Sequence, residues 1–182
     1  MEPNILLRDP IRHNVWATGH LIRFCRDQHL TPAQLTAVGV GTFGTISQTL
    51  HHIVQWDEIY LRRLADQPAE FVPEEPPGFD ELERRNAEAG AGWEDLMAAP
   101  IDPERVIVVL NGARETRAGI FLAQAINHAN HHREQVCAIL TGLGIQPPDI
   151  QAWSYALASG RMWDSEGEER AQVVTFSQPP ST

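Results

Sequence analysis

The sequence predicts an all-α protein with four main helices and one small β-hairpin before the last of them. In four long segments, apolar residues recur at steps of three and four, which is the period of a helix with one buried face. One short run, Val106 to Leu110, has the β-branched composition of a strand. The 182 residues suffice for one domain with its own core. We therefore expect a helical domain over residues 1–163 and a tail over residues 164–182 that is partly disordered or packs against a partner chain.

The first expected elements are two helices and a region of turns. A helix is predicted from Asp9 to about Gln28, because an acidic residue followed by proline is a typical helix start. The pattern from Thr31 to Gln34 is a capping signal and predicts a second, short helix. Three glycines then lack the strand-to-helix context of a phosphate-binding loop, and we assign them to turns: Gly39, Gly41 and Gly44.

A proline-rich crossover separates the second long segment from the third. Prolines at four positions between Gln67 and Gly78 end the preceding helix and predict an extended chain, so the next helix need not run antiparallel to the last. The third long helix is predicted over about Phe79 to Leu96, with one narrow apolar face and a charged remainder. Gly90 and Gly92 reduce its expected regularity.

A β-hairpin is predicted before the last long helix. The strand from Val106 to Leu110 leads into Asn111-Gly112, a common hairpin turn, and into a polar returning arm from Ala113 to Arg117. The last long helix follows over about Ile120 to Leu143. Two prolines after it open a final short helix around Trp153 to Met162.

Three histidines crowd into five positions of the last long helix, as His128, His131 and His132. Residues four apart lie one above the other on a helix, so His128 and His132 can reach one ion. A helical wheel places His128 at the edge of the apolar arc and His132 inside it, whereas His131 falls on the polar side. The spacing predicts half of a metal site; the alternative is a pair of hydrogen-bonded core histidines.

A third ligand is expected from the second long segment, Ile46 to Leu64, because a stably held transition metal usually has three or four protein donors. There the wheel places His52 at the border of the apolar arc and His51 at the centre of the polar arc. The pattern therefore selects His52, His128 and His132 as metal ligands. His51 and His131 are expected to face solvent, and His131 could also support a ligand.

Two charged residues fall on apolar arcs. Asp57 does so on the His52 segment and Arg133 on the His128 segment. An isolated buried charge is costly, so buried charges are paired or hydrogen-bonded. We expect Asp57 and Arg133 to contact each other or to bind helix-end groups, and so to brace the histidine helices. The alternative is that either side chain reaches the surface at a helix edge.

Composition excludes several classes of protein. With 14 basic and 24 acidic side chains, the net charge is −10, and no basic stripe appears, which argues against a nucleic-acid partner. Cys25 and Cys137 occupy apolar helix positions, where a reduced and inert thiol is the default. No stretch has the apolar length of a signal peptide or a membrane span. A cytoplasmic protein that does not bind membranes is expected.

Four segments together resemble the DinB / YfiT-like superfamily, over about residues 8 to 162. The strongest is NHANHHREQV, which contains both histidines of the H-x-x-x-H pair. The run from His52 to Asp57 resembles the first-histidine helix of that family, and Asn14 to Ala17 resembles its opening helix. Residues 142–148 resemble the segment after its last core helix. The family more often has glycine where this chain has Glu134.

The resemblance implies a four-helix bundle of up-down-down-up topology, often assembled as a homodimer. It also implies that His52, His128 and His132 hold a divalent metal, commonly zinc or nickel. The function it implies is that of a metal-dependent enzyme for a small-molecule substrate, such as a thiol-dependent S-transferase using a low-molecular-weight thiol, or a hydrolase. The rival is a non-catalytic stress-response or scaffold protein whose metal is structural or absent.

No general base is evident in the sequence. Gln135 lies near the histidine stripe but cannot titrate, and Glu134 points away from it. Candidate helpers are found elsewhere in the chain: His13, His20, His29 and Asp57.

Overall fold

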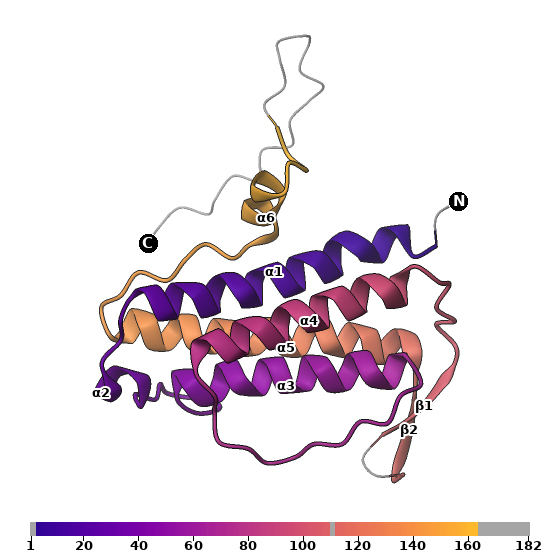
Figure 1. Ribbon diagram of the computed structural model, residues 1–182, viewed down its shortest axis with the longest axis horizontal. Coiled ribbons are helices and arrows are strands. Elements are labelled where there is room, and N and C mark those ends of the chain that lie inside the picture. The colour runs from indigo at the N-terminus through magenta and orange to yellow at the C-terminus, as the bar shows by residue number, and fades with distance from the viewer. Residues whose placement is uncertain (1–2, 110–111, 164–182) are drawn as a thin grey trace, which may run out of the picture.

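Four long helices lie side by side in the computed structural model, which describes residues 3–109 and 112–163 (Figure 1). A two-stranded antiparallel hairpin directly precedes the last of the four, as the sequence predicts. Within the described residues, no helix is long and apolar enough to cross a membrane. The predicted tail, residues 164–182, lies outside the described part of the chain. The elements are α1 (Ile5–Asp27), α2 (Pro32–Leu35), α3 (Ile46–Leu64), α4 (Phe79–Met97), β1 (Val106–Val109), β2 (Arg114–Arg117), α5 (Ala118–Gly142) and α6 (Ala152–Ala158).

The first helix begins four residues earlier than predicted. It starts at Ile5, and Pro10 lies inside it rather than in its first turn. The added turn places Leu7 against a buried apolar cluster, and the side-chain amide of Asn4 donates hydrogen bonds to the carbonyls of Met97 (3.2 Å) and Ala99 (2.6 Å). These contacts with the end of α4 favour the longer helix despite the backbone donor that proline lacks.

Capping boxes fix the starts of α2 and α3. The predicted box at Thr31 and Gln34 is present, and an equivalent box joins Thr45 to Gln48. In each, the threonine hydroxyl accepts from the backbone N–H three residues later, and the glutamine side chain accepts from the threonine N–H. The second box sets where the His52 helix begins.

The α4 helix is continuous through Gly90 and Gly92, because these glycines allow close packing. A Cβ atom at Gly90 would lie 2.8 Å from Val15 of α1, and one at Gly92 would lie 2.6 Å from Leu61 of α3. Both distances are too short for a side chain. The two glycines that reduce the expected regularity of the helix are therefore positions where α1 and α3 pack closely against it.

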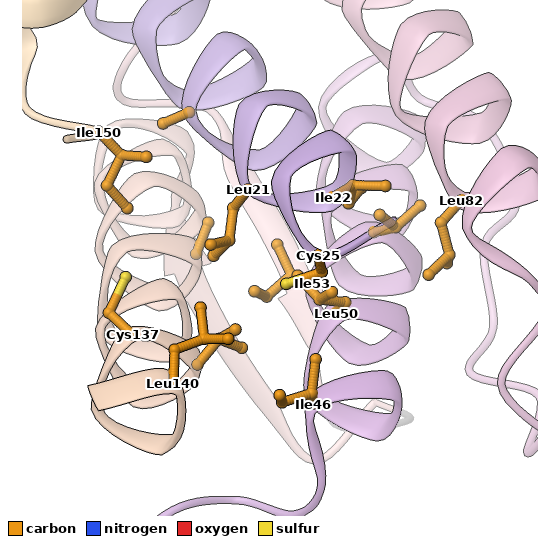
Figure 2. Packing of buried hydrophobic residues seen from close by; sticks show 14 of the residues in the cluster. Leu21, Ile22, Cys25, Ile46, Leu50, Ile53, Leu82, Cys137, Leu140 and Ile150 are labelled. Atoms are coloured by element: carbon orange, nitrogen blue, oxygen red, sulfur yellow. The ribbon is translucent and has the colours of Figure 1, made fainter. Parts of the chain in front are cut away.

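The buried core is formed by side chains from all four long helices (Figure 2). Leu21 of α1, Leu50 of α3 and Leu140 of α5 are fully buried at its centre. Cys25 and Cys137 belong to the same cluster as free, buried thiols. Burial raises the pKa of Cys25 to about 12 and that of Cys137 to about 11, which keeps both protonated and agrees with the inert role predicted for them.

One buried polar network contains a side chain from each long helix. Arg133 of α5 donates to the side-chain oxygen of Asn14 of α1 (2.8 Å), and the Asn14 amide nitrogen donates to Asp57 of α3 (3.3 Å). The indole N–H of Trp93 in α4 donates to the other Asp57 oxygen (2.8 Å), and Arg133 also donates to Thr18 (3.0 Å). Asp57 and Arg133 are therefore buried and compensated as predicted, but they are joined through Asn14 instead of touching directly or binding helix ends.

Burial and partners have opposite effects on the Asp57 carboxyl. Burial raises the pKa of Asp57 to about 6, whereas the Trp93 hydrogen bond and the Arg133 charge oppose that rise. Removing Arg133 would leave the carboxylate without its cation, and breaking a buried pair in this way is strongly destabilising. The relative positions of the four long helices therefore depend on the buried charge of Arg133.

We expect Arg133→Met to lower the free energy of unfolding by about 3–5 kcal/mol. Urea unfolding followed by circular dichroism measures the loss. Adding Asp57→Asn to Arg133→Met should restore part of it, because the unpaired charge is then removed. The matched control is Arg62→Met at an exposed position of α3, which should change stability by no more than about 0.5 kcal/mol. Equal small effects of both arginine substitutions would contradict the role given to Arg133.

Candidate metal centre

The structure brings together the three histidines selected from the sequence. His52 comes from α3, and His128 and His132 lie one turn apart on α5. One ligand nitrogen from each falls within 4.8 Å of the other two, and the Nε2 atoms of His52 and His128 are 3.0 Å apart. Three imidazole nitrogens this close form a donor set that could hold a divalent metal ion.

Aromatic rings surround the three histidines, which we call the histidine cluster. Phe43 stacks on the His52 ring at a centroid distance of 4.0 Å and meets His132 edge-on. Trp56 and Tyr60 contact His128 from the other side, at centroid distances of 5.9 and 5.7 Å. These rings limit water around the imidazoles and restrict their rotation.

Burial keeps the imidazoles neutral. Burial, together with the smaller effect of the nearby His132, lowers the pKa of His52 to about 4 and that of His128 to about 3. Burial also lowers the pKa of His132, although its hydrogen bond to Gln135 opposes the change. Neutral imidazole is the form that binds metals, so the cluster is ready to accept an ion at neutral pH without losing protons first.

Gln135 orients His132 and fixes the loop above it. Its side-chain oxygen lies 2.8 Å from Nδ1 of His132 and also accepts from the backbone N–H of Phe43 (3.1 Å). Its amide nitrogen lies 3.3 Å from the carbonyl of Gly41 and 3.1 Å from Nε2 of His131. A bond from Nδ1 to a glutamine oxygen leaves Nε2 of His132 as the free ligand atom.

The prediction that His51 faces solvent is wrong. Only 5% of this residue is exposed, because the crossover between α3 and α4 covers that side of α3. Gln55, which shares the polar arc, donates to the carbonyl of Val72 (2.6 Å), and Glu74 lies 3.5 Å from Nε2 of His51. Burial and the charge of Arg85 lower the pKa of His51, and Glu74 opposes this. The helical wheel could not show that a loop would occupy its polar arc.

The remaining histidines and acids take different places. His131 and Glu134 are exposed on the polar side of α5, as predicted. Of the candidate helpers, His13 lies 2.8 Å from the carbonyl of Ile150 through its Nε2, and His20 stacks on Trp16, so both are engaged along α1. His29 lies just beyond the end of α1, and Asp57 belongs to the buried network. None of these four has a contact with the histidine cluster in the described part of the chain.

A cavity of about 330 Å³ opens beside His52 and is called the polar cavity here. Its walls include His51 and His52 of α3, Phe43 of the preceding loop, and Phe71 and Glu74 of the crossover. Its volume falls within the range of small-molecule sites. One residue of the cluster, His52, is therefore on the wall of a space that a small molecule can enter.

Sequence reasoning missed the roles of Phe43 and Gln135. Phe43 lies in the glycine-containing loop, whose path is set by contacts with α5 and not by any helical period. Gln135 was noted near the histidine stripe but was considered only as a base. Its position three residues after His132, where a helical side chain can reach its neighbour, was the available signal.

Comparison with known sequences gives one family. A sequence model described as the DinB family matches residues 4–169. No curated protein matches the chain.

We expect Gln135→Leu to weaken metal affinity by roughly 10–100-fold, although Gln135 is not itself a ligand. The substitution removes the hydrogen bond that fixes the His132 ring and releases the loop at Phe43. Competition with a chromogenic chelator measures the affinity. The matched control is Glu134→Leu, the adjacent exposed position of α5, which should bind metal as the wild type does. An unchanged affinity in Gln135→Leu would refute the orienting role.

We expect the metal-free protein to lose stability as the pH falls from about 7 to about 4. The pKa values of His52 and His128 are lower in the folded chain than the ordinary value of 6.5, so the unfolded state binds more protons in this range. The contribution of these two histidines to stability is complete above about pH 6.5 and is lost as the pH approaches their folded-state pKa values. Thermal unfolding at several pH values measures the decline. The decline of stability with falling pH should be shallower for His128→Gln, whereas the exposed variant His131→Gln should follow the wild type. Identical slopes for the wild type and both variants would contradict the expectation.

Proposed function

The chain belongs to the DinB family, and from this membership we propose that it is a metal-dependent enzyme acting on a small molecule. In this proposal His52, His128 and His132 are the ligands of one divalent ion, zinc or nickel. The observation that carries it is the convergence of three neutral imidazoles from two helices, one of which, His52, is on the wall of the polar cavity.

The donor set suits a catalytic ion. Three protein ligands are typical of catalytic zinc sites, whereas structural zinc usually has four. Among the described residues, no fourth histidine, cysteine, aspartate or glutamate belongs to the cluster. When bound, an ion of this kind acts as a Lewis acid and lowers the pKa of a water or thiol in its open position.

The protein side chains have separate tasks in this proposal. Gln135 holds the His132 ring in the orientation that presents Nε2, and Phe43 stacks on His52 and shields it from water. The polar cavity admits the substrate beside His52. Glu74 and Glu75 at its wall give this entrance an acidic character, which disfavours anionic substrates.

For the reaction, we propose thiol-dependent S-transfer with a low-molecular-weight thiol, or hydrolysis. The likeness to thiol-dependent members of the superfamily supports the first. The second follows from the general chemistry of three-histidine sites. Cys25 and Cys137 are buried and protonated, so the thiol has to come from the substrate.

The rival function is a non-catalytic bundle with a structural ion or none. Ligand exchange separates the two. In cobalt-substituted protein, an open ion should change its visible absorption spectrum when 2-mercaptoethanol is added, whereas a closed structural ion should not.

We also propose that the long helices follow the up-down-down-up order of the family. Support comes from the crossover over residues 65–78, which runs back along the molecule before α4 begins (Figure 1). A long connection of this kind allows α3 and α4 to be parallel.

We expect the untagged protein to hold close to one metal ion per chain, and alanine substitution at His52, His128 or His132 to abolish this. Elemental analysis of purified protein measures the stoichiometry. The neighbouring residues His51 and His131 give matched controls, and His51→Ala and His131→Ala should retain the ion. A folded wild type that stays empty after incubation with zinc and with nickel would overturn the proposal.

A further inference from the structure

A second, larger cavity adjoins the polar cavity. It has a volume of about 580 Å³ and is called the apolar cavity here. Phe71 of the crossover is on the wall of both cavities, so the two spaces meet at this side chain. Phe71 therefore marks the place where the two cavities adjoin.

Five segments of the chain form the walls of the apolar cavity: α3, the crossover, β1, β2 and α5. Trp56 and Tyr60 come from α3, Phe71 from the crossover, Val108 from β1, and Ile120 from α5. The Trp56 ring stacks on Phe71 with a centroid distance of 5.9 Å and an interplanar angle of 22°. An open cavity lined on several sides by aromatic and branched side chains suits a small organic group.

The two charged side chains at this cavity, Arg63 and Glu70, have opposite signs and so do not select an ion of either sign. Arg63 is on the wall, but its guanidinium donates to the carbonyls of Ala69 (2.7 Å) and Val108 (3.4 Å) and so joins the crossover to the hairpin. Glu70 is an exposed acid at the same wall, which disfavours anions. An uncharged apolar group is therefore the best complement to these walls.

Trp56 links the apolar cavity to the histidine cluster. Its indole is on the cavity wall and also lies 5.9 Å from His128 and 6.1 Å from His52, measured between ring centroids. Tyr60, on the same wall, also contacts His128 at 5.7 Å. A group held in this cavity lies one aromatic ring away from the proposed metal ligands.

We propose that the apolar cavity binds a neutral aromatic or branched aliphatic group of the molecule on which the histidine cluster acts. This inference rests on the proposed function, and it makes the substrate an amphipathic small molecule. Its polar end enters the cavity beside His52, and its apolar end occupies the space beyond Phe71.

The first arm of the test measures binding in the apolar cavity by fluorescence, so the metal is not the reporter. The probe is N-phenyl-1-naphthylamine, a neutral fluorophore whose emission rises in apolar sites, titrated into the metal-loaded full chain. We expect saturable binding near one probe per chain, and Ile120→Gln should raise the dissociation constant about tenfold. The matched control is Ile5→Gln, an exposed isoleucine on α1 that is not on the cavity wall and should bind the probe as the wild type does.

The second arm examines the link to the histidines in cobalt-substituted protein. Ethanethiol and phenylmethanethiol share a thiol but differ in apolar size, and visible absorption reports their binding. We expect phenylmethanethiol to bind about 10–100-fold more tightly than ethanethiol, which corresponds to the free energy gained by burying one phenyl ring. The Ile120→Gln substitution should reduce this ratio and leave ethanethiol affinity unchanged.

The outcomes of the two arms are separable. Absence of saturable probe binding overturns the inference, whatever the cobalt spectrum shows. Equal affinity for the two thiols also overturns it, because the apolar group then gains nothing. If neither thiol changes the cobalt spectrum but the probe binds and Ile120→Gln weakens it, the thiol chemistry fails while the cavity stands. In a further outcome, probe binding weakens as the protein concentration is raised, while the sedimentation coefficient increases. That result would assign the cavity to a second copy of the chain and overturn the inference.

Discussion

Arg133 carries a positive charge into the interior of the helical domain, and the arrangement of the four long helices depends on how that charge is compensated. Asn14 lies between Arg133 and Asp57, with its oxygen toward the cation and its nitrogen toward the carboxylate. Trp93 completes the network from α4. Because Arg133 directly follows His132 in the chain, the rotation of α5 that satisfies the arginine also determines where that imidazole points. The buried network and the histidine cluster are therefore two consequences of one helix orientation.

Much of the helical framework and the candidate metal set could be predicted from periodicity. The H-x-x-x-H spacing places His128 and His132 on one stripe of their helix. A helical wheel of the other segment places His52 at the border of the apolar arc and His51 on the polar arc. These inferences depend only on which residues share a face of one helix. Helical geometry fixes that property locally, so no knowledge of the tertiary arrangement was needed.

The incorrect or missing predictions concern contacts between segments that are far apart in the chain. His51 is buried because the crossover lies over α3, and a wheel contains no information about where a loop will pack. Phe43 reaches His52 because Gln135 holds its backbone, a contact between residues 92 positions apart. Asn14 was noted only for its family likeness, since nothing in its local sequence reveals a cation 119 positions away. Long-range complementarity of this kind is set by the folded shape.

The sequence separation within the buried network has a consequence for the order of assembly. Asp57 is reached by Trp93 after one crossover, but its compensating cation arrives only with the last long helix. A chain in which α1, α3 and α4 have docked without α5 contains an apolar interior with an uncompensated carboxylate, which favours solvation of that interior over its closure. Without α5, burial of the Asp57 carboxylate therefore costs free energy that the Arg133 charge does not offset. Because α5 carries Arg133 as well as His128 and His132, the helix that compensates the buried carboxylate is also the helix that completes the histidine cluster.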